Sequence, residues 1–322
     1  MARQIRTVHS RSSLRRVTKD LLSLGPVPRE YVRRLLSLAA ELKRLRRQGK
    51  VHARLAGRTL GLLFQKASTR TRVSFEVGMN QLGGQALFLP IGDIQLSRGE
   101  SVTDTARVLS RYLDGLVIRT FDQAIVEEWA RESTIPIING LTDLHHPCQA
   151  LSDLLTIQEK KGRLKGLKLA YVGDGNNMAN SLIEAGAKVG MSVSVGCPKG
   201  YQPDAAVVDG ARQEAHEMRC AIELTEDPDL AVKDADIVYT DVWISMGQER
   251  EQARRLKAFE SYQVNDRLMK RARPDAIVLH CLPAHRGEEI SARVLDGPQS
   301  VVLDQAENRL HMQKAILVDL LS

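Results

Sequence analysis

Short apolar segments alternate with amphipathic helical patterns along this chain of 322 residues. Four apolar segments in the first half are separated by helical patterns at 70–82, 102–113 and 122–132. A long helical pattern at 148–161 follows, and the alternation then restarts. Such alternation predicts an α/β fold, here as two doubly wound domains, each with a mostly parallel sheet flanked by helices. The expected strands are Leu60–Phe64, Ala86–Leu89, Leu116–Ile118, Ile135–Ile138, Leu169–Val172, Val193–Val195, Ile222–Leu224, Ile237–Tyr239, Ile277–Leu279 and Val301–Leu303.

The length of the chain agrees with about two domains. We expect the first over residues 1–147 and the second over 148–304, with the helix at 148–161 as the bridge. Pro28 begins a helix ahead of the first strand, and a final helix is expected from Gln305 to Leu321.

The turn between the first expected strand and the next helix carries Lys66, Ser68, Thr69, Arg70 and Thr71. Unpaired backbone N–H groups and the positive end of the helix dipole favour an anion at such a turn. The hydroxyl groups, the planar Arg70 fork and the compact charge of Lys66 add donors for phosphate oxygens. An ordinary Ser/Thr helix cap with solvated basic neighbours is the alternative. The Gly-x4-Gly-Lys-Ser/Thr pattern of a P-loop is absent from this turn.

The formal net charge of +7 comes from the N-terminal segment. Residues 1–50 carry 14 Lys and Arg against three acidic residues, a balance of +11, so the other 272 residues sum to −4. Only 4% of the residues are aromatic, and they are not interleaved with basic ones. The composition therefore argues against nucleic-acid binding, which uses base stacking and an extended basic surface.

Cysteine usage and the N-terminal segment bear on the compartment. The four cysteines form no CxxC pair, which favours a reducing compartment, and no apolar run reaches transmembrane length. The first 19 residues are basic, contain several serines and lack acids, which fits either a mitochondrial transit peptide or a frayed bacterial N-terminus. We expect a cytoplasmic protein, with the mitochondrial matrix as the alternative.

Residues able to do chemistry follow five of the expected strands. In open parallel sheets, ligands bind beyond the carboxyl ends of the strands, where these residues would meet. Each residue alone could be a helix cap or a local ion pair, and a buried cysteine is often a small apolar residue. Their recurrence at strand ends favours a site. The five places are Arg119, His146-Pro147-Cys148-Gln149, Asn176-Asn177, Asp241 to Gly247 and His280-Cys281-Leu282-Pro283.

Three other kinds of site find little support in the sequence. The histidines and Cys281 are suitable metal ligands but lack zinc-finger spacing and the HExxH motif, so we expect no metal. Gly173 and Gly175 follow a strand, but Met178 occupies the third glycine position of a dinucleotide-binding loop. The GxSxG motif of serine hydrolases is absent.

The chain resembles the aspartate/ornithine carbamoyltransferases from about Leu21 to the C-terminus. Ser-Thr-Arg-Thr at 68–71, HPxQ at 146–149, DxxxSMG at 241–247 and HCLP at 280–283 occur in the family order and are jointly very specific. The DVWISMG sequence and the cysteine of HCLP are similar to the ornithine branch rather than the aspartate branch.

The resemblance implies transfer of a carbamoyl group from carbamoyl phosphate to the δ-amine of L-ornithine, giving L-citrulline and phosphate without a cofactor. The first domain would bind carbamoyl phosphate and the second ornithine. The final helix, 305–322, would pack back on the first domain, so that two helices link the domains. Gln65 replaces the usual Glu, which affects only local charge balance. The residues implied to bind carbamoyl phosphate are Ser68, Thr69, Arg70, Thr71, Arg119, His146, Gln149, Cys281, Leu282 and Arg309.

The implied roles divide at the transferred carbonyl. Thr71, Arg119 and His146 would surround its oxygen and stabilise the oxyanion, while Gln149 would hold the amino group. Cys281 would lie near the δ-amine, which must lose a proton before attack, and the leaving phosphate can accept that proton. The implied catalytic residues are Arg119, His146, Asp241 and Cys281. For ornithine, the resemblance implies that Asn177 and Met246 bind the α-carboxylate. It implies that Asp241 and Ser245 bind the α-amino group.

The family forms trimers with the site at a subunit boundary, and Leu96 to Ser101 match the loop that a neighbouring chain contributes. The resemblance therefore implies a homotrimer or a multiple of trimers, with a plain surface loop as the alternative. Other functions stay open. They are a sister transferase acting on putrescine or N-acylated ornithine, a non-catalytic phosphoanion-binding subunit, and a nicotinamide-dependent oxidoreductase, which Met178 disfavours.

Overall fold

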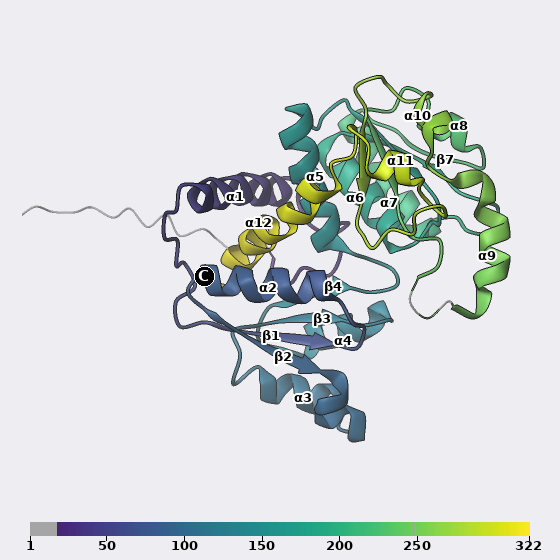
Figure 1. Cartoon of the computed structure of the whole chain (residues 1–322). Helices are drawn as coiled ribbons and strands as arrows, with labels where there is room; N and C mark the ends of the chain where they lie inside the picture. The colour runs from purple at the N-terminus through teal and green to yellow at the C-terminus, as the bar shows by residue number, and fades with distance from the viewer. Residues whose placement is uncertain (1–17, 246, 248) are drawn as a thin grey trace, which may run out of the picture.

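The computed structural model describes residues 18–322 apart from positions 246 and 248 (Figure 1). The basic N-terminal segment lies outside the described residues except for its last two positions. The described chain contains two β-sheets in which all neighbouring strands are parallel, with helices packed on them. The predicted α/β class is therefore confirmed.

The first sheet has four strands in the order β2-β1-β3-β4. The central strands β1 and β3 are almost entirely buried, because helices cover both faces of the sheet. Leu62 of β1 lies opposite Phe88 on one side and Val117 on the other. The strands are β1 (Thr59–Phe64), β2 (Gln85–Pro90), β3 (Gly115–Arg119) and β4 (Ile137–Leu141).

Three helices of the first half begin at polar caps. Ser68, Ser101 and Asp122 each accept a hydrogen bond from a backbone N–H in the first turn of the helix that follows. In Figure 1, α2 and α3 lie on opposite sides of the sheet. The helix predicted over 102–113 is shorter than expected. The elements are α2 (Thr69–Gln81), η1 (Ile91–Asp93), η2 (Gln95–Arg98), α3 (Val102–Leu109) and α4 (Gln123–Glu132).

The second sheet has five strands in the order β7-β6-β5-β8-β9. Its first strand, β5, is central, so the chain runs first to one edge and then to the other, and the order reverses between β5 and β8. The strands are β5 (Lys168–Val172), β6 (Ser192–Gly196), β7 (Ile222–Thr225), β8 (Ile237–Thr240) and β9 (Ile277–His280). The helices are α6 (Asn177–Val189), α7 (Ala205–Met218), α8 (Pro228–Val232), η3 (Glu249–Glu251), α9 (Gln252–Phe259), η4 (Glu260–Tyr262), α10 (Asp266–Met269) and α11 (Ala292–Leu295).

Two long, largely buried helices connect the regions around the two sheets. α5 (Pro147–Lys161) contacts β4 of the first sheet and α6 of the second. α12 (Val302–Leu321) packs against α1 (Arg29–Arg47), α2 and α5, and Figure 1 shows it running beside α1. The division of the chain at residue 147 remains a prediction.

Two expected strands need correction. The predicted strand Val301–Leu303 is wrong, because Ser300 makes one isolated bridge to Val278 and the chain then enters α12. The segment predicted over Ile135–Ile138 starts later, at Ile137, and extends further. Pro136 has no N–H to donate to a ladder, which disfavours an earlier start.

Over the residues that the structure describes, no helix combines the length and the apolar character needed to cross a membrane.

Candidate active site

A pocket of about 500 Å³ lies where the carboxyl ends of strands from both sheets face each other. In each sheet, this edge includes the point where the strand order reverses, which is the usual ligand site of open α/β sheets. The five places singled out at strand ends all contribute to its wall. They supply Arg119, His146, Asn177, Asp241 and Cys281, among others.

The turn before α2 forms one wall of the pocket with Ser68, Thr69, Arg70 and Thr71. The Ser68 Oγ accepts from the Thr71 backbone nitrogen at 3.2 Å and lies 3.0 Å from the Thr71 hydroxyl. No acidic residue lies in the first turn of α2. The helix N-terminus therefore presents its positive end to the pocket, as the sequence predicts.

Three guanidinium groups reach this wall from different elements. Arg70 donates to the Leu282 carbonyl oxygen at 2.6 Å, and Arg309 of α12 donates to the Thr71 hydroxyl at 2.7 Å. Arg119 ends β3, and its Nε has no hydrogen-bond partner among the described residues. Burial, with the charges of Arg309 and Arg70, lowers the pKa of Arg119 to about 10. The group still carries its charge near neutral pH, so this wall is strongly cationic.

His146 sits in the same cationic surroundings. Its side chain lines the pocket, and its backbone nitrogen donates to the Ser181 hydroxyl at 2.8 Å. Burial, followed by the charges of Arg309, Arg119 and Arg70, lowers the pKa of His146 well below its ordinary value. The imidazole is therefore neutral and has one N–H to donate, while its Nδ1 has no partner among the described residues.

Gln149 lies behind Arg309 and does not belong to the described pocket lining. Its Oε1 accepts from Arg309, and its Nε2 donates to Asp153 at 2.8 Å. Asp153 is fully buried and also accepts from Gln305 at 2.8 Å and from the Tyr239 hydroxyl at 3.1 Å. Burial raises the pKa of Asp153 to about 7. The predicted contact of Gln149 with a carbamoyl amino group stays a prediction.

The opposite wall of the pocket carries a carboxylate. The two oxygens of the buried Asp241 accept from the Asn176 amide at 3.0 Å and from the Cys281 thiol at 2.9 Å. Burial and the neighbouring Asp241 raise the pKa of Cys281 well above its ordinary value. Cys281 is therefore a neutral thiol that donates to Asp241 and is unsuited to nucleophilic attack.

The turn after β9 has an unusual backbone conformation. Leu282 has φ of 59°, in the left-handed region that is uncommon for residues other than glycine. Its N–H donates to His280 Nδ1 at 2.9 Å, so His280 carries its proton on Nε2, which lies 3.2 Å from Glu289. These bonds, together with Arg70 on the carbonyl, hold the turn against the pocket.

The remaining predicted ornithine-binding residues follow β5 and β8. Asn177 begins α6 and donates to the Thr142 carbonyl oxygen at 2.5 Å, and both Asn177 and Ser245 line the pocket. Met246 lies outside the described residues. The structure thus brings together the described members of the predicted set, except that Gln149 is one layer further back.

Some contacts of the site were not predicted. The sequence predicts Lys66 as a phosphate donor, but it is buried, pairs with Asp143 and lies 4.1 Å from the centre of the Phe121 ring, so its charge is already partnered. Asn176 was singled out at its strand end without a role, and it donates to Asp241. Asp143 carried no local signal, because its partner lies 77 positions away in the chain.

Two groups of potential metal ligands occur among the described residues. Asp241, His280 and Cys281 form one, but these side chains already bond to Asn176, Glu289 and each other. The other is His285, Glu288 and Glu289. The expectation of no metal remains a prediction.

Comparison with known proteins matches both halves of the chain. Residues 19–159 match the family model for the aspartate/ornithine carbamoyltransferase carbamoyl-P binding domain, and residues 165–320 match that for the Asp/Orn binding domain. An ornithine carbamoyltransferase from Syntrophus aciditrophicus is 57% identical over 299 residues, which cover 93% of this chain and 98% of that protein. An anabolic ornithine carbamoyltransferase from Pyrococcus furiosus is 55% identical, covering 93% and 95%.

A solved structure has a fold similar to that of this chain. The ornithine carbamoyltransferase of Pyrococcus furiosus superimposes with a TM-score of 0.92 at 54% identity, covering 94% of this chain and 97% of that chain. The chain therefore belongs to the aspartate/ornithine carbamoyltransferase family.

Proposed function

We propose that this protein is an ornithine carbamoyltransferase, which converts carbamoyl phosphate and L-ornithine into L-citrulline and phosphate. The observation that carries the proposal is the polarity of one pocket. Three guanidinium groups and a helix N-terminus line one wall, and the buried carboxylate of Asp241 lines the other. A dianion and an ammonium group fit these two walls respectively.

Carbamoyl phosphate would place its phosphate on the turn before α2. Ser68, Thr69, Arg70 and Thr71 supply hydroxyl, backbone and guanidinium donors there, and Arg119 adds a charge. The carbonyl oxygen would then face Arg119 and the neutral imidazole of His146. Donors already fixed around the developing oxyanion would lower the barrier to attack.

Ornithine would bind against the opposite wall of the pocket. Asp241 and Ser245 are proposed to hold its α-amino group, and Asn177 with the backbone of Met246 its α-carboxylate. This places the δ-amine near Cys281. The free amine attacks the carbamoyl carbon, a C–N bond forms, and the C–O bond to phosphate breaks with its electron pair on phosphate. The departing phosphate can take the amine proton, so no covalent enzyme intermediate is needed.

The test is citrulline formation by purified protein with ornithine, putrescine, N-acetylornithine or aspartate as acceptor. Turnover of ornithine in large excess over the other three is expected. Turnover of putrescine or an acylated ornithine instead would indicate a sister transferase. Binding of carbamoyl phosphate without turnover of any acceptor would indicate a binding subunit.

We also propose that the protein assembles as a trimer or a multiple of trimers. Residues 97–101 are exposed, and Leu96 to Ser101 are not part of the described lining of this chain's own pocket. Such a loop can complete a neighbour's site. Mixing an inactive Arg70 variant with an inactive Arg98 variant should then restore part of the activity, because some sites combine two intact contributions. Absence of restoration in a verified mixed oligomer would contradict the shared site.

The metabolic direction and the compartment belong to the same proposal. A role in arginine biosynthesis is supported by the relative described as anabolic. The cytoplasm is the proposed location, with the mitochondrial matrix as the alternative, and cell fractionation distinguishes them.

A further inference from the structure

His146 lies in a short loop between β4 and α5 that is held together from within. The Thr142 backbone nitrogen donates to the His145 carbonyl oxygen at 2.9 Å, and the His145 nitrogen donates to the Thr142 hydroxyl at 3.1 Å. His146 itself is 4% exposed. A loop this enclosed depends on its neighbours for its exact position, because its polar backbone groups need partners.

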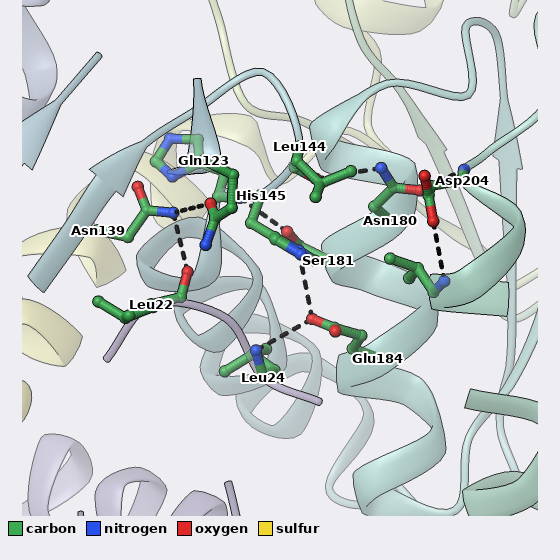
Figure 2. Close-up of polar contacts among 12 residues, drawn as sticks. Leu22, Leu24, Gln123, Asn139, Leu144, His145, Asn180, Ser181, Glu184 and Asp204 are labelled. Carbon is green, nitrogen blue, oxygen red and sulfur yellow. Dashed lines mark hydrogen bonds and ion pairs between the residues drawn. The ribbon is translucent and has the colours of Figure 1, made fainter. Parts of the chain in front are cut away.

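One face of α6 supplies those partners. Asn177, Asn180, Ser181 and Glu184 follow the helical spacing i, i+3, i+4, i+7, so their side chains lie on one side of the helix. Asn177 and Asn180 donate to the carbonyl oxygens of residues 142 and 144 at 2.5 and 3.1 Å. Ser181 accepts from the His146 nitrogen at 2.8 Å, and Glu184 lies 3.5 Å from His145 Nδ1. Figure 2 shows this face of α6 against the loop.

Ser181 is the member of this face that bonds to the His146 backbone. It is fully buried and absent from the described pocket lining, so it acts on His146 and not on a ligand. His146 is the N-cap residue of α5 and is followed by a proline, which has no N–H of its own. Loss of the Ser181 oxygen would leave the His146 N–H without its partner in a dry environment, and the loop would shift to find another.

We propose that Ser181 is a positioning residue for carbamoyl transfer, holding the His146 backbone so that the imidazole faces the carbonyl oxygen of the substrate. This role rests on the proposed function. It ties a residue of the phosphate side to a helix of the acceptor side, because α6 follows β5 of the second sheet.

The experiment compares two identical substitutions, Ser181→Ala and Ser152→Ala. Ser152 is also fully buried and lies on a neighbouring helix, but its hydroxyl donates to Cys148 within its own helix. Ser181→Ala should lower kcat by roughly 10-fold or more, as a misplaced catalytic group does, with KM for carbamoyl phosphate changed less than about 3-fold. Ser152→Ala should keep kcat within about 2-fold of the wild type.

Hydrogen exchange of the His146 amide supplies a second, activity-independent readout. Exchange should accelerate in Ser181→Ala and stay unchanged in Ser152→Ala, because only the first removes its acceptor. Unchanged kcat in Ser181→Ala, equal loss in both variants, or unchanged exchange at His146 would each overturn the positioning role. A wild type that forms no citrulline would instead overturn the proposed function, and the exchange result would still decide whether Ser181 anchors the loop.

Discussion

The two walls of the pocket are built in different ways. On the phosphate side, hydrogen bonds join the polar groups into a chain from Asp153 through Gln149 and Arg309 to Thr71. On the acceptor side, Asp241 accepts from Asn176 and from Cys281 among the residues that the structure describes. The first wall holds several cations fixed by neighbours, and the second holds one carboxylate with a neutral thiol beside it.

This difference implies that the two walls have different roles in binding the substrates. A fixed cationic wall attracts and orients a dianion without moving, since its donors are already in place. A single carboxylate can hold an ammonium group but provides little else. Arg70 connects the walls, because its guanidinium bonds to the carbonyl oxygen of Leu282. Occupation of the phosphate side is therefore expected to influence the acceptor side.

The largest expected effect comes from Asp241→Asn. The amide keeps the shape but removes the negative partner of a substrate ammonium group. Ornithine affinity should fall by about 2–5 kcal/mol, as for a truncated buried charge pair. Carbamoyl phosphate affinity should stay nearly unchanged, because the cationic wall is intact. Steady-state kinetics in both substrates and an equilibrium titration of carbamoyl phosphate measure these two effects separately.

The opposite pattern would reverse the assignment of the two walls. If Asp241→Asn weakened carbamoyl phosphate binding and left ornithine unaffected, the carboxylate side would be the phosphate side.

Arg70→Lys tests the fixed geometry of the cationic wall. Lysine keeps the charge but loses the planar fork, so it cannot bond to phosphate and to the Leu282 carbonyl in the same way. The loss in kcat/KM for carbamoyl phosphate should be at least about 2 kcal/mol. Arg72→Lys is the matched control, since Arg72 lies on the same helix but is 45% exposed and pairs with Glu76. A kcat/KM within about 2-fold of wild type in both variants would contradict a role for the fork.

The coupling between the walls predicts an order of binding. A phosphonate analogue of carbamoyl phosphate should bind to the free protein, and ornithine should bind at least about 10-fold more tightly once that analogue is present. Calorimetry of ornithine with and without the analogue measures this factor. Equal ornithine affinity in both titrations would show that the walls act independently.

Residues with a local signal could be predicted from the sequence. Arg119 and His146 follow apolar segments, and the turn before α2 carries its own cap and charges. The strand order within each sheet and the meeting of the two sheets' edges follow from α/β rules rather than from single residues. The strand predicted at Val301–Leu303 is wrong because three apolar residues do not distinguish a strand from the first turn of a buried helix.

Contacts that depend on how the sheets pack could not be predicted. Arg70 and Leu282 are 212 positions apart, and only the packed structure joins them. Gly175 illustrates the same limit. A Cβ there would lie 2.3 Å from the backbone nitrogen of Pro203, so this close approach of two loops by itself requires glycine. The position of Ser181 beside the site could have been predicted, since Ser181 is four residues after Asn177 and lies on the same face of the helix.

The smallest expected effect concerns Glu184, where α6 meets the loop of His146. Glu184 accepts from the Leu24 nitrogen at 3.0 Å, and burial raises its pKa to about 7 despite Lys188 nearby. Facing it, His145 has its pKa lowered to about 4 by burial, so the imidazole is neutral in this range.

Because its pKa is higher in the folded state, Glu184 adds stability at low pH, and this contribution disappears as pH rises through about 7. Glu184→Gln lacks the titration but can still accept from Leu24. Urea unfolding at pH values of about 5 and about 8 should therefore show wild type losing about 1 kcal/mol more than the variant. The exposed Glu30→Gln is the control and should follow wild type. Identical pH dependence in wild type and Glu184→Gln would mean that the folded protein holds Glu184 ionised, and that α6 contacts the phosphate-side loop through a charge.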